Sequence, residues 1–257
     1  MRSARRFLAR LCLTGLGLAA LAGCSGRGLD VEGEAFPAVK PILAARQEAL
    51  AVPRYLALAR ADAPGTIAFV EQRGAIDLLR RERVSADGVQ SWLSQDGSLF
   101  AFRDGMLIAT RGLGADLMSA DAGASLALIR TRTPGQATRY MSTLDGDHTI
   151  EPQVYQCDIT DDGPFRLDLT HTVVQTRIMV ETCYGTRLNF QNLYWVDGAG
   201  EIRQSRQYVG TLTGLVSFRP VDTETARNMS RGIPGLRPMD AAPGSSTSGS
   251  TPAEAQP

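Results

Sequence analysis

Short apolar runs separated by turn sequences fill residues 55 to 219. Runs such as TIAFVEQ, SLFAF, MLIAT and ATRYMSTL often alternate between apolar and polar positions, and APG, ADG, QDG, RDG and TPG separate them. A spacing of about ten residues with Asp-Gly turns is typical of antiparallel strands joined in sequence. We assign YLALA, AIDLLRRERV and SLALIRTRT to the same set. The pattern predicts a mainly β domain, an antiparallel meander that curves strongly or closes like a barrel to hide its edges.

The second half of the chain continues this pattern. We predict strands at 153–159, 165–170, 173–183, 187–196, 201–210 and 212–219. The sequence DDGP at 161–164 predicts a hairpin turn between the first two of them. One short helix is predicted before the sheet, at 41–51 (PILAARQEALA), because proline suits a first helical turn and the apolar residues have helical spacing.

The N-terminus has the features of an export signal. Four arginines within the first ten residues precede an apolar run, Leu11 to Ala22, which is shorter than the roughly 18 residues needed to cross a bilayer. It ends in LAGC, which resembles the bacterial lipobox, so residues 1–23 are expected to be a signal peptide and Cys24 to carry a diacylglycerol. The alternative is an ordinary signal peptide with a chance cysteine. Ser25 follows, and by resemblance to the usual sorting rule this favours the periplasmic face of the outer membrane.

The expected organisation follows from these boundaries. Residues 24–35 form a tether, 36–225 a single β-rich domain, and 226–257 a largely disordered tail, because its Pro, Ser and Gly cannot bury apolar surface. The whole chain has 27 basic and 27 acidic residues. Removing residues 1–23 takes away four arginines and no acid, leaving 23 basic against 27 acidic residues and a net charge of −4. No basic stripe suits nucleic acid.

Two cysteines remain in the expected mature domain. Cys157 and Cys183 have no CxxC spacing, and a single pair in an oxidising compartment favours a disulfide over a catalytic thiol or a metal site. Closing a loop of this length would stabilise the fold by roughly 3–4 kcal/mol on the chain-entropy model.

The stretch TRGLGADLMSAD at 110–121 is the densest in glycine and charge. It lacks the third glycine and the surrounding βαβ pattern of a dinucleotide loop, and the only lysine of the chain is Lys40, so no nucleotide site is expected. Its simplest interpretation is a turn after a buried strand, in which Arg111 and Asp116 pair and Asp116 caps one helical turn at 117–119.

Catalytic patterns are sparse. The two histidines are His148 and His171, and the acids of LDGDHT around His148 fit a hairpin turn as well as a metal site. No G-x-S-x-G or H-E-x-x-H sequence occurs. We therefore expect no catalytic residue, metal or cofactor, although any two facing carboxylates would allow a glycosidase.

Several segments together resemble a known family. A W-x-x-x-D-G sequence at Trp92 is followed by RDGMLIATRGLGADLMSAD, a two-cysteine region and YWVDGAGEIRQSRQYVG. Over about residues 50–220 this arrangement is similar to the GfcB/YjbF lipoprotein family, whose genes accompany exopolysaccharide and group 4 capsule secretion genes. The resemblance implies an antiparallel β fold and a non-enzymatic outer-membrane role in making or exporting a surface polysaccharide.

The expected partners are the membrane, through Cys24, and either the polysaccharide or an outer-membrane export protein. Aromatic and charged groups suit sugar faces and hydroxyls, so the candidate contacts are Trp92, Arg111, Asp116, Trp195, Arg206 and Tyr208. Core packing is the alternative for both tryptophans. The alternative functions are a polysaccharide-modifying hydrolase, or a lipid or lipoprotein carrier with an apolar cavity.

Overall fold

The computed structural model describes residues 51–144, 149–169, 172–231 and 233. Every described residue belongs to one compact unit within residues 36–257. The predicted signal peptide, Cys24 and tether lie outside the described residues, as do His148, His171 and nearly all of the predicted helix at 41–51. No helix in the described ranges is long and apolar enough to cross a membrane.

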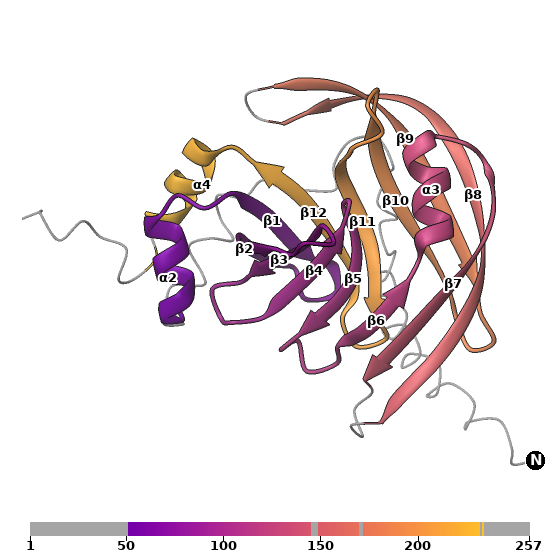
Figure 1. Ribbon diagram of the computed structural model, residues 1–257, viewed down its shortest axis with the longest axis horizontal. Helices are drawn as coiled ribbons and strands as arrows, with labels where there is room; N and C mark the ends of the chain where they lie inside the picture. Colours follow the sequence, from indigo (N-terminus) through magenta and orange to yellow (C-terminus); the bar gives the residue numbers. More distant parts are fainter. Residues whose placement is uncertain (1–50, 145–148, 170–171, 232, 234–257) are drawn as a thin grey trace, which may run out of the picture. The chain divides into compact units, whose positions relative to one another are not determined.

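A single antiparallel sheet of twelve strands confirms the mainly β prediction (Figure 1). Strands that follow each other in sequence are paired, apart from β5 and β6, which stand at the two ends of the strand order. In addition, β1 pairs with β12. These two end strands lie side by side, so the sheet curls into a nearly closed barrel. The strands are β1 (Gly65–Val70), β2 (Ala75–Val84), β3 (Val89–Leu93), β4 (Leu99–Arg103), β5 (Met106–Arg111), β6 (Leu117–Asp121), β7 (Gly135–Leu144), β8 (Ile150–Asp168), β9 (Val173–Tyr184), β10 (Asn189–Asp197), β11 (Ile202–Gly210) and β12 (Gly214–Val221).

Two runs predicted as strands are helices. YLALA lies in α2 (Pro53–Arg60) and SLALIRTRT begins in α3 (Gly123–Thr131). In α2 the proline stands in the first turn, and the buried Tyr55 and Ala59 are four residues apart, which places them on one helical face. The five residues of YLALA are too few to distinguish the helical spacing of buried residues from the alternation of a strand.

The sequence DDGP at 161–164 is not the hairpin turn that its residues predicted. β8 continues through it, and its residues from Gln156 to Asp168 pair with β9, with a shift of register between Asp161 and Gly163. Gly163 has a φ of 109° and donates its N–H to Asp161 Oδ1 at 2.9 Å. The residues that predicted a turn therefore form a β-bulge, in which an extra residue bends the strand.

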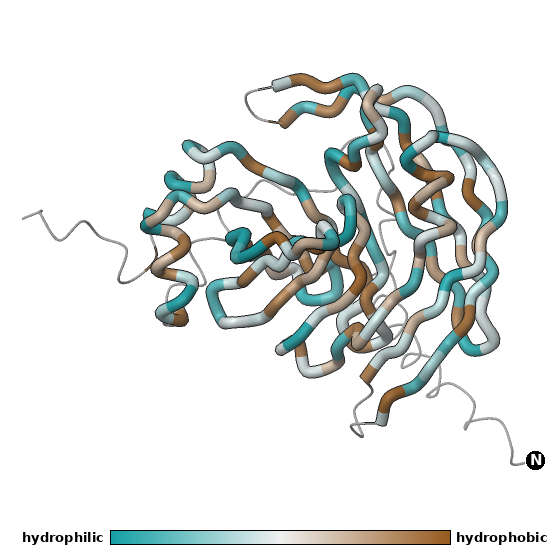
Figure 2. Tube along the Cα trace, viewed as in Figure 1, coloured by the Kyte–Doolittle hydropathy of each residue, from teal (hydrophilic) through white to brown (hydrophobic). Residues whose placement is uncertain are grey.

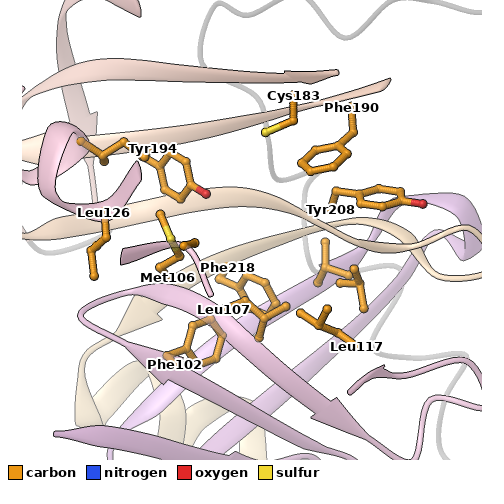
Figure 3. Packing of buried hydrophobic residues seen from close by; sticks show 14 of the residues in the cluster. Phe102, Met106, Leu107, Leu117, Leu126, Cys183, Phe190, Tyr194, Tyr208 and Phe218 are labelled. Atoms are coloured by element: carbon orange, nitrogen blue, oxygen red, sulfur yellow. The ribbon is translucent and has the colours of Figure 1, made fainter. Parts of the chain in front are cut away.

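The barrel interior is filled with side chains. Its main cluster joins residues of all twelve strands with Leu126 and Ile129 of α3. This helix packs on the inner side of β7, β8 and β10 (Figures 1 and 2). Phe102 of β4 and Phe218 of β12 meet edge to face, with ring centroids 4.9 Å apart (Figure 3). The interior is thus a packed core in which side chains from opposite walls meet.

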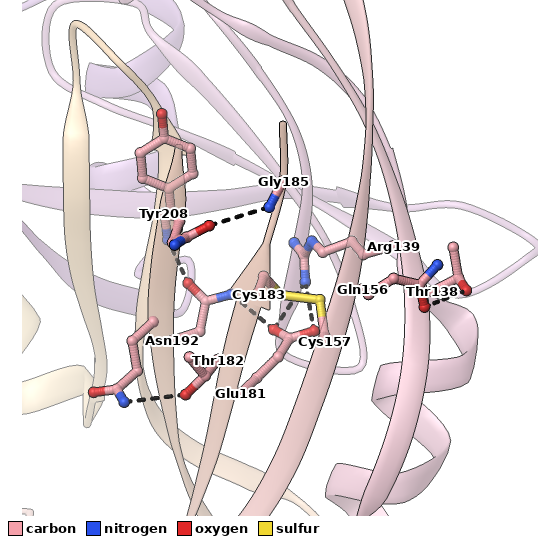
Figure 4. Close-up of a disulfide and its surroundings, with 12 residues drawn as sticks. Thr138, Arg139, Gln156, Cys157, Glu181, Thr182, Cys183, Gly185, Asn192 and Tyr208 are labelled. Atoms are coloured by element: carbon pink, nitrogen blue, oxygen red, sulfur yellow. Dashed lines mark hydrogen bonds and ion pairs between the residues drawn. A yellow bond between two sulfur atoms is a disulfide. The ribbon is translucent and has the colours of Figure 1, made fainter. Parts of the chain in front are cut away.

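A buried ion pair lies within this core. Arg139 Nη1 of β7 is 3.2 Å from Glu181 Oε2 of β9, and both side chains are fully buried. The same carboxylate accepts hydrogen bonds from Asn192 Nδ2 at 2.7 Å and from the Tyr194 hydroxyl at 3.0 Å. Asn192 Oδ1 accepts the backbone N–H of Tyr208 at 2.7 Å (Figure 4). One carboxylate therefore links β7, β9, β10 and, through Asn192, β11.

The environment fixes the charge of each member. Burial alone would raise the pKa of Glu181, but the charge of Arg139 and the hydrogen bonds from Asn192 and Tyr194 bring this pKa below its ordinary value. Burial works against the charge of Arg139 as well, and the Glu181 carboxylate raises the pKa of the guanidinium. Burial and the same carboxylate raise the pKa of Tyr194 well above 10.0. The pair is therefore ionised and the phenol neutral at neutral pH.

The predicted disulfide is present beside this ion pair. Cys157 of β8 and Cys183 of β9 are directly opposite each other in the ladder, and their sulfur atoms are bonded (Figure 4). Both are buried. The bond closes a sequence separation of 26 residues. Because it links two strands that already pair, it fixes their register next to the buried carboxylate.

Two helices cover the other face of the sheet near β1 and β2. The helix α4 (Thr223–Ser230) and α2 pack there, and the buried guanidinium of Arg80 donates to Ala63 O at 2.7 Å, Ala226 O at 2.8 Å and Ser230 Oγ at 2.6 Å. Ile233 packs with Tyr55 in a second, small cluster. The folded chain thus continues past residue 225, where the sequence pattern placed the end of the domain; residues 234–257 lie outside the described ranges.

Replacing Arg139 by leucine should lower the free energy of unfolding by about 3–5 kcal/mol, because Glu181 would be left buried without a counter-charge. The measurement is urea denaturation followed by circular dichroism. Arg187→Leu is the matched control, since its ion pair with Glu151 is exposed and should cost less than about 1 kcal/mol. Equal effects of the two substitutions would contradict the proposed importance of the buried pair.

The stability should also depend on pH through Glu181. Its folded pKa is below the ordinary value of 4.5, so its contribution is fully present above about pH 4.5 and is lost as pH falls through the folded value. Urea midpoints measured from pH 7 downward should show this loss. Glu181→Gln should remove the part of the acid slope that Glu181 contributes, and an unchanged slope in that variant would exclude the carboxylate as its source.

Candidate functional site

A cavity of about 370 Å³ opens at the barrel end that carries the β4–β5 and β10–β11 turns. The ends of β1, β3, β4, β11 and β12 line it together with the last turn of α3. Trp92 and Phe102 are its aromatic walls, and Phe218 continues them into the core. Gln90 and Ser205 supply polar side chains. The mouths of β-barrels are a common place for ligand sites, and this volume lies at the lower end of their range.

Trp92 is held in place by a residue of the neighbouring strand. It lies on β3 opposite Arg81 of β2, and the Arg81 guanidinium carbon stands 6.0 Å from the centre of the Trp92 ring, within range of a cation–π interaction. The side chain is 8% exposed. Gln90 precedes it by two residues on the same strand, so both side chains face the same side and reach the cavity.

Paired charges surround the opening. Arg130, in the last turn of α3, donates from Nη1 to Asp104 Oδ2 at 2.8 Å and from Nε to Gly200 O at 3.1 Å, so it joins the β4–β5 turn to the β10–β11 turn. Arg203 Nη1 is 2.9 Å from Glu201 Oε2. All four charged side chains line the cavity. Their charges balance within the rim.

Glycines allow the turns of the rim to approach the helix and strand beside them. Gly200 has a φ of 81°, and a Cβ there would lie 2.7 Å from Arg130 O. Gly105 has a φ of 84°, and a Cβ there would lie 2.8 Å from Ile202 Cβ. The GAG and RDG turns of the sequence are therefore needed for the close packing of the rim.

The β8–β9 hairpin reaches the same end of the barrel. β9 pairs with β10 only as far as Thr176, opposite Asp197, and beyond that point β8 and β9 pair only with each other among the described strands. Leu169, at the end of this projection, lines the cavity. Nearby on β12, burial lowers the pKa of Arg219, although Asp168 acts in the opposite direction. In Figure 1 the projection extends above the body of the barrel.

The structure places one of the six candidate contacts, Trp92, in the cavity. Trp195 is buried on β10, with its ring centre 6.2 Å from that of Phe165. Tyr208 is stacked on Phe190 inside the barrel at 4.6 Å, and burial, with a smaller effect of Tyr155, raises its pKa to about 12. The candidates therefore do not form one site.

Arg206 takes part in an ion pair on the surface of the sheet. Its Nε and Nη2 atoms donate to the two carboxylate oxygens of Glu71 at 2.6 and 2.7 Å. Glu71 belongs to η2 (Glu71–Arg73), which connects β1 to β2, and its Oε1 also accepts the hydroxyl of Ser217. The bidentate geometry fixes the β1–β2 connection against β11 and β12.

Arg111 and Asp116 lie in the turn that joins the two ends of the sheet. Asp116 is buried, and its carboxylate accepts the N–H groups of Gly112 and Leu113 and the hydroxyl of Thr110 at 2.9 to 3.2 Å. Arg111 instead donates to Leu117 O and to the next carbonyl of β6, so the two side chains bind backbone and hydroxyl groups of the turn. The predicted helical turn at 117–119 is wrong, because these residues begin β6.

The residues that complete the cavity were missed by sequence reasoning. Phe102, Gln204 and Phe218 come from strands far apart in sequence, and no motif groups them. The available signal was alternation: Gln90 and Trp92 share one face of a short strand, and Arg203 and Ser205 share one face of another. Knowing which strands meet requires the sheet order.

The fold and the cavity define the chain as an antiparallel β-barrel with a ligand-sized opening at one end. The model of the family described as group 4 capsule polysaccharide lipoprotein GfcB, YjbF matches residues 45–220. The chain therefore belongs to this family of capsule-associated lipoproteins.

The chain is also similar to two lipoproteins of Escherichia coli. The chain is 28% identical over 152 residues to the uncharacterized lipoprotein YjbF of Escherichia coli (strain K12), covering 55% of this chain and 68% of that protein. The crystal structure of the hypothetical lipoprotein YmcC from Escherichia coli (K12) matches with a TM-score of 0.57 at 20% identity, over 63% of this chain and 88% of that one. This second likeness concerns the fold alone.

Asp116→Ala should lower the free energy of unfolding by about 2–3 kcal/mol, because buried donors of the turn between β5 and β6 would lose a charged acceptor. Thermal and urea unfolding measure the change. Asp121→Ala is the control, since its exposed carboxylate accepts a hydrogen bond from Gly123 at 3.2 Å and should cost about 1 kcal/mol or less. If Asp116→Ala were as mild as the control, the turn would not depend on this carboxylate.

Proposed function

We propose that the protein is a non-enzymatic accessory of capsule or exopolysaccharide production or export, anchored by Cys24 to the periplasmic face of the outer membrane. The family assignment to capsule-associated lipoproteins is the observation that carries this proposal. The lipobox-like LAGC sequence with Ser25 supports the anchor and its membrane. Accessory action then means contact with the polymer or with an export protein.

The mixed lining of the cavity supports contact with the polymer. Aromatic rings offer flat apolar faces to the C–H groups of sugars, and side-chain amides and hydroxyls offer donors and acceptors to sugar hydroxyls. An acyl chain would instead need a deep apolar space, whereas the described interior is filled by the core cluster and α3. The lining thus favours a sugar ligand over the lipid-carrier alternative.

A polysaccharide-modifying hydrolase is the second candidate, because two carboxylates, Asp104 and Glu201, line the same cavity. Each of them is exposed and bound to an arginine. A glycosidase requires one carboxyl group to be held protonated, which an apolar pocket or a second carboxylate would achieve. The salt-bridged rim offers neither environment, so the non-enzymatic accessory is the better supported function.

Deleting the gene should lower the amount of surface polysaccharide, and a plasmid copy of the wild-type gene should restore it. The measurement is the polysaccharide recovered from washed cells. Cys24→Ala in the plasmid copy should fail to restore the amount, because the protein would lose its anchor, and Asp104→Asn should restore it, because no hydrolysis is involved. An unchanged amount of polysaccharide in the deletion strain would refute the proposed function.

A further inference from the structure

We propose that the cavity at the barrel mouth is a binding site for uncharged sugar residues of the polysaccharide, with Trp92 as the stacking surface. This inference rests on the proposed function, and it adds the location of the site and the chemical class of its ligand. Its basis is the coincidence, in one cavity, of an aromatic wall, polar side chains and a charge-balanced rim.

The size of the cavity suits a short stretch of glycan. A hexose fills roughly the space of six water molecules, on the order of 180 Å³ at about 30 Å³ per water. The cavity of about 370 Å³ therefore accommodates one or two sugar rings. It is too small for a longer stretch of polymer, so the rest of the chain would lie outside the mouth.

Stacking and hydrogen bonding come from opposite parts of the lining. Trp92 and Phe102 contribute aromatic rings from β3 and β4, whereas Ser205 contributes a hydroxyl from β11. Gln90 adds a side-chain amide beside the tryptophan.

The rim determines that the sugar is uncharged. Both arginines that line the cavity are committed to carboxylates, Arg130 to Asp104 and Arg203 to Glu201. A uronate or phosphate group entering the cavity would be desolvated, and it would have to displace a carboxylate to gain a counter-charge. A neutral ring needs neither step. The site should therefore select neutral hexoses or N-acetylhexosamines over acidic sugars.

The test measures binding of the host's own extracellular polysaccharide to the full-length protein purified from membranes in detergent, by calorimetry. Trp92→Ala should weaken binding about tenfold, the upper range of an aromatic contact. Gln90→Ala, at a partly exposed position, should also weaken binding, and it replaces Trp92→Ala as the test variant if Trp92→Ala does not fold. Trp195→Phe is the matched control, because Trp195 does not line the cavity, and it should bind like the wild type.

Competition then tests the ligand class. Neutral trisaccharides of glucose, galactose or N-acetylglucosamine should displace the polymer better than trigalacturonate does. The inference would be overturned if the folded Trp92→Ala and Gln90→Ala variants bound the polymer like the wild type, or if the wild type bound no polymer at all. It would also be overturned if trigalacturonate competed more strongly than the neutral trisaccharides, or if none of the probes competed. The proposed function would survive each of these results if gene deletion still lowered surface polysaccharide, so the two failures are distinguishable.

Discussion

The buried carboxylate of Glu181 is the constraint around which the closed part of the sheet is organised. It lies at the inner face of β9, pairs with Arg139 of β7 and accepts hydrogen bonds from two side chains of β10. A buried charge is tolerated only when its partners are fixed, so the positions of these strands are mutually dependent. The neighbouring disulfide between Cys157 and Cys183 holds the register of β8 against β9 and with it the position of the carboxylate.

The cavity is a consequence of how the barrel closes. One arm of the sheet runs from β1 to β5, the other from β12 back to β6, and the TRGLGAD turn joins their ends. Gln207 of β11 reaches across the interior, where its amide donates to Gly105 O and accepts from Leu107 N. This cross-link and the core cluster fill the middle of the barrel. The cavity at the barrel mouth is therefore bounded by strand ends and turns, which supply its mixture of aromatic, amide and charged groups.

The sequence predicted the fold class, the disulfide and most strands, because alternation and Asp-Gly turns are local signals. It assigned α2 and α3 as strands, because their short apolar runs fit both the helical and the strand period. It assigned DDGP as a hairpin turn, because a turn and a β-bulge favour the same residues. The site was less predictable. Trp92 was found by its chemistry, but Phe102, Gln204 and Phe218 come together only through the pairing of distant strands. Arg206 was predicted as a ligand contact because its ion-pair partner, Glu71, is distant in sequence. Asp116 was predicted as one because its hydrogen-bond partners are backbone groups of its own turn, which no motif reveals.

The most direct test of the account uses the two tryptophans of the chain, which give two indole N–H signals in a nitrogen–proton NMR spectrum. Trp92 lines the cavity, and Trp195 is buried outside its lining. Titration with a neutral oligosaccharide prepared from the host polymer should shift the Trp92 indole signal progressively to saturation and leave that of Trp195 nearly in place. A saturable shift confined to Trp195, or no shift of either signal, would contradict a glycan site at the barrel mouth.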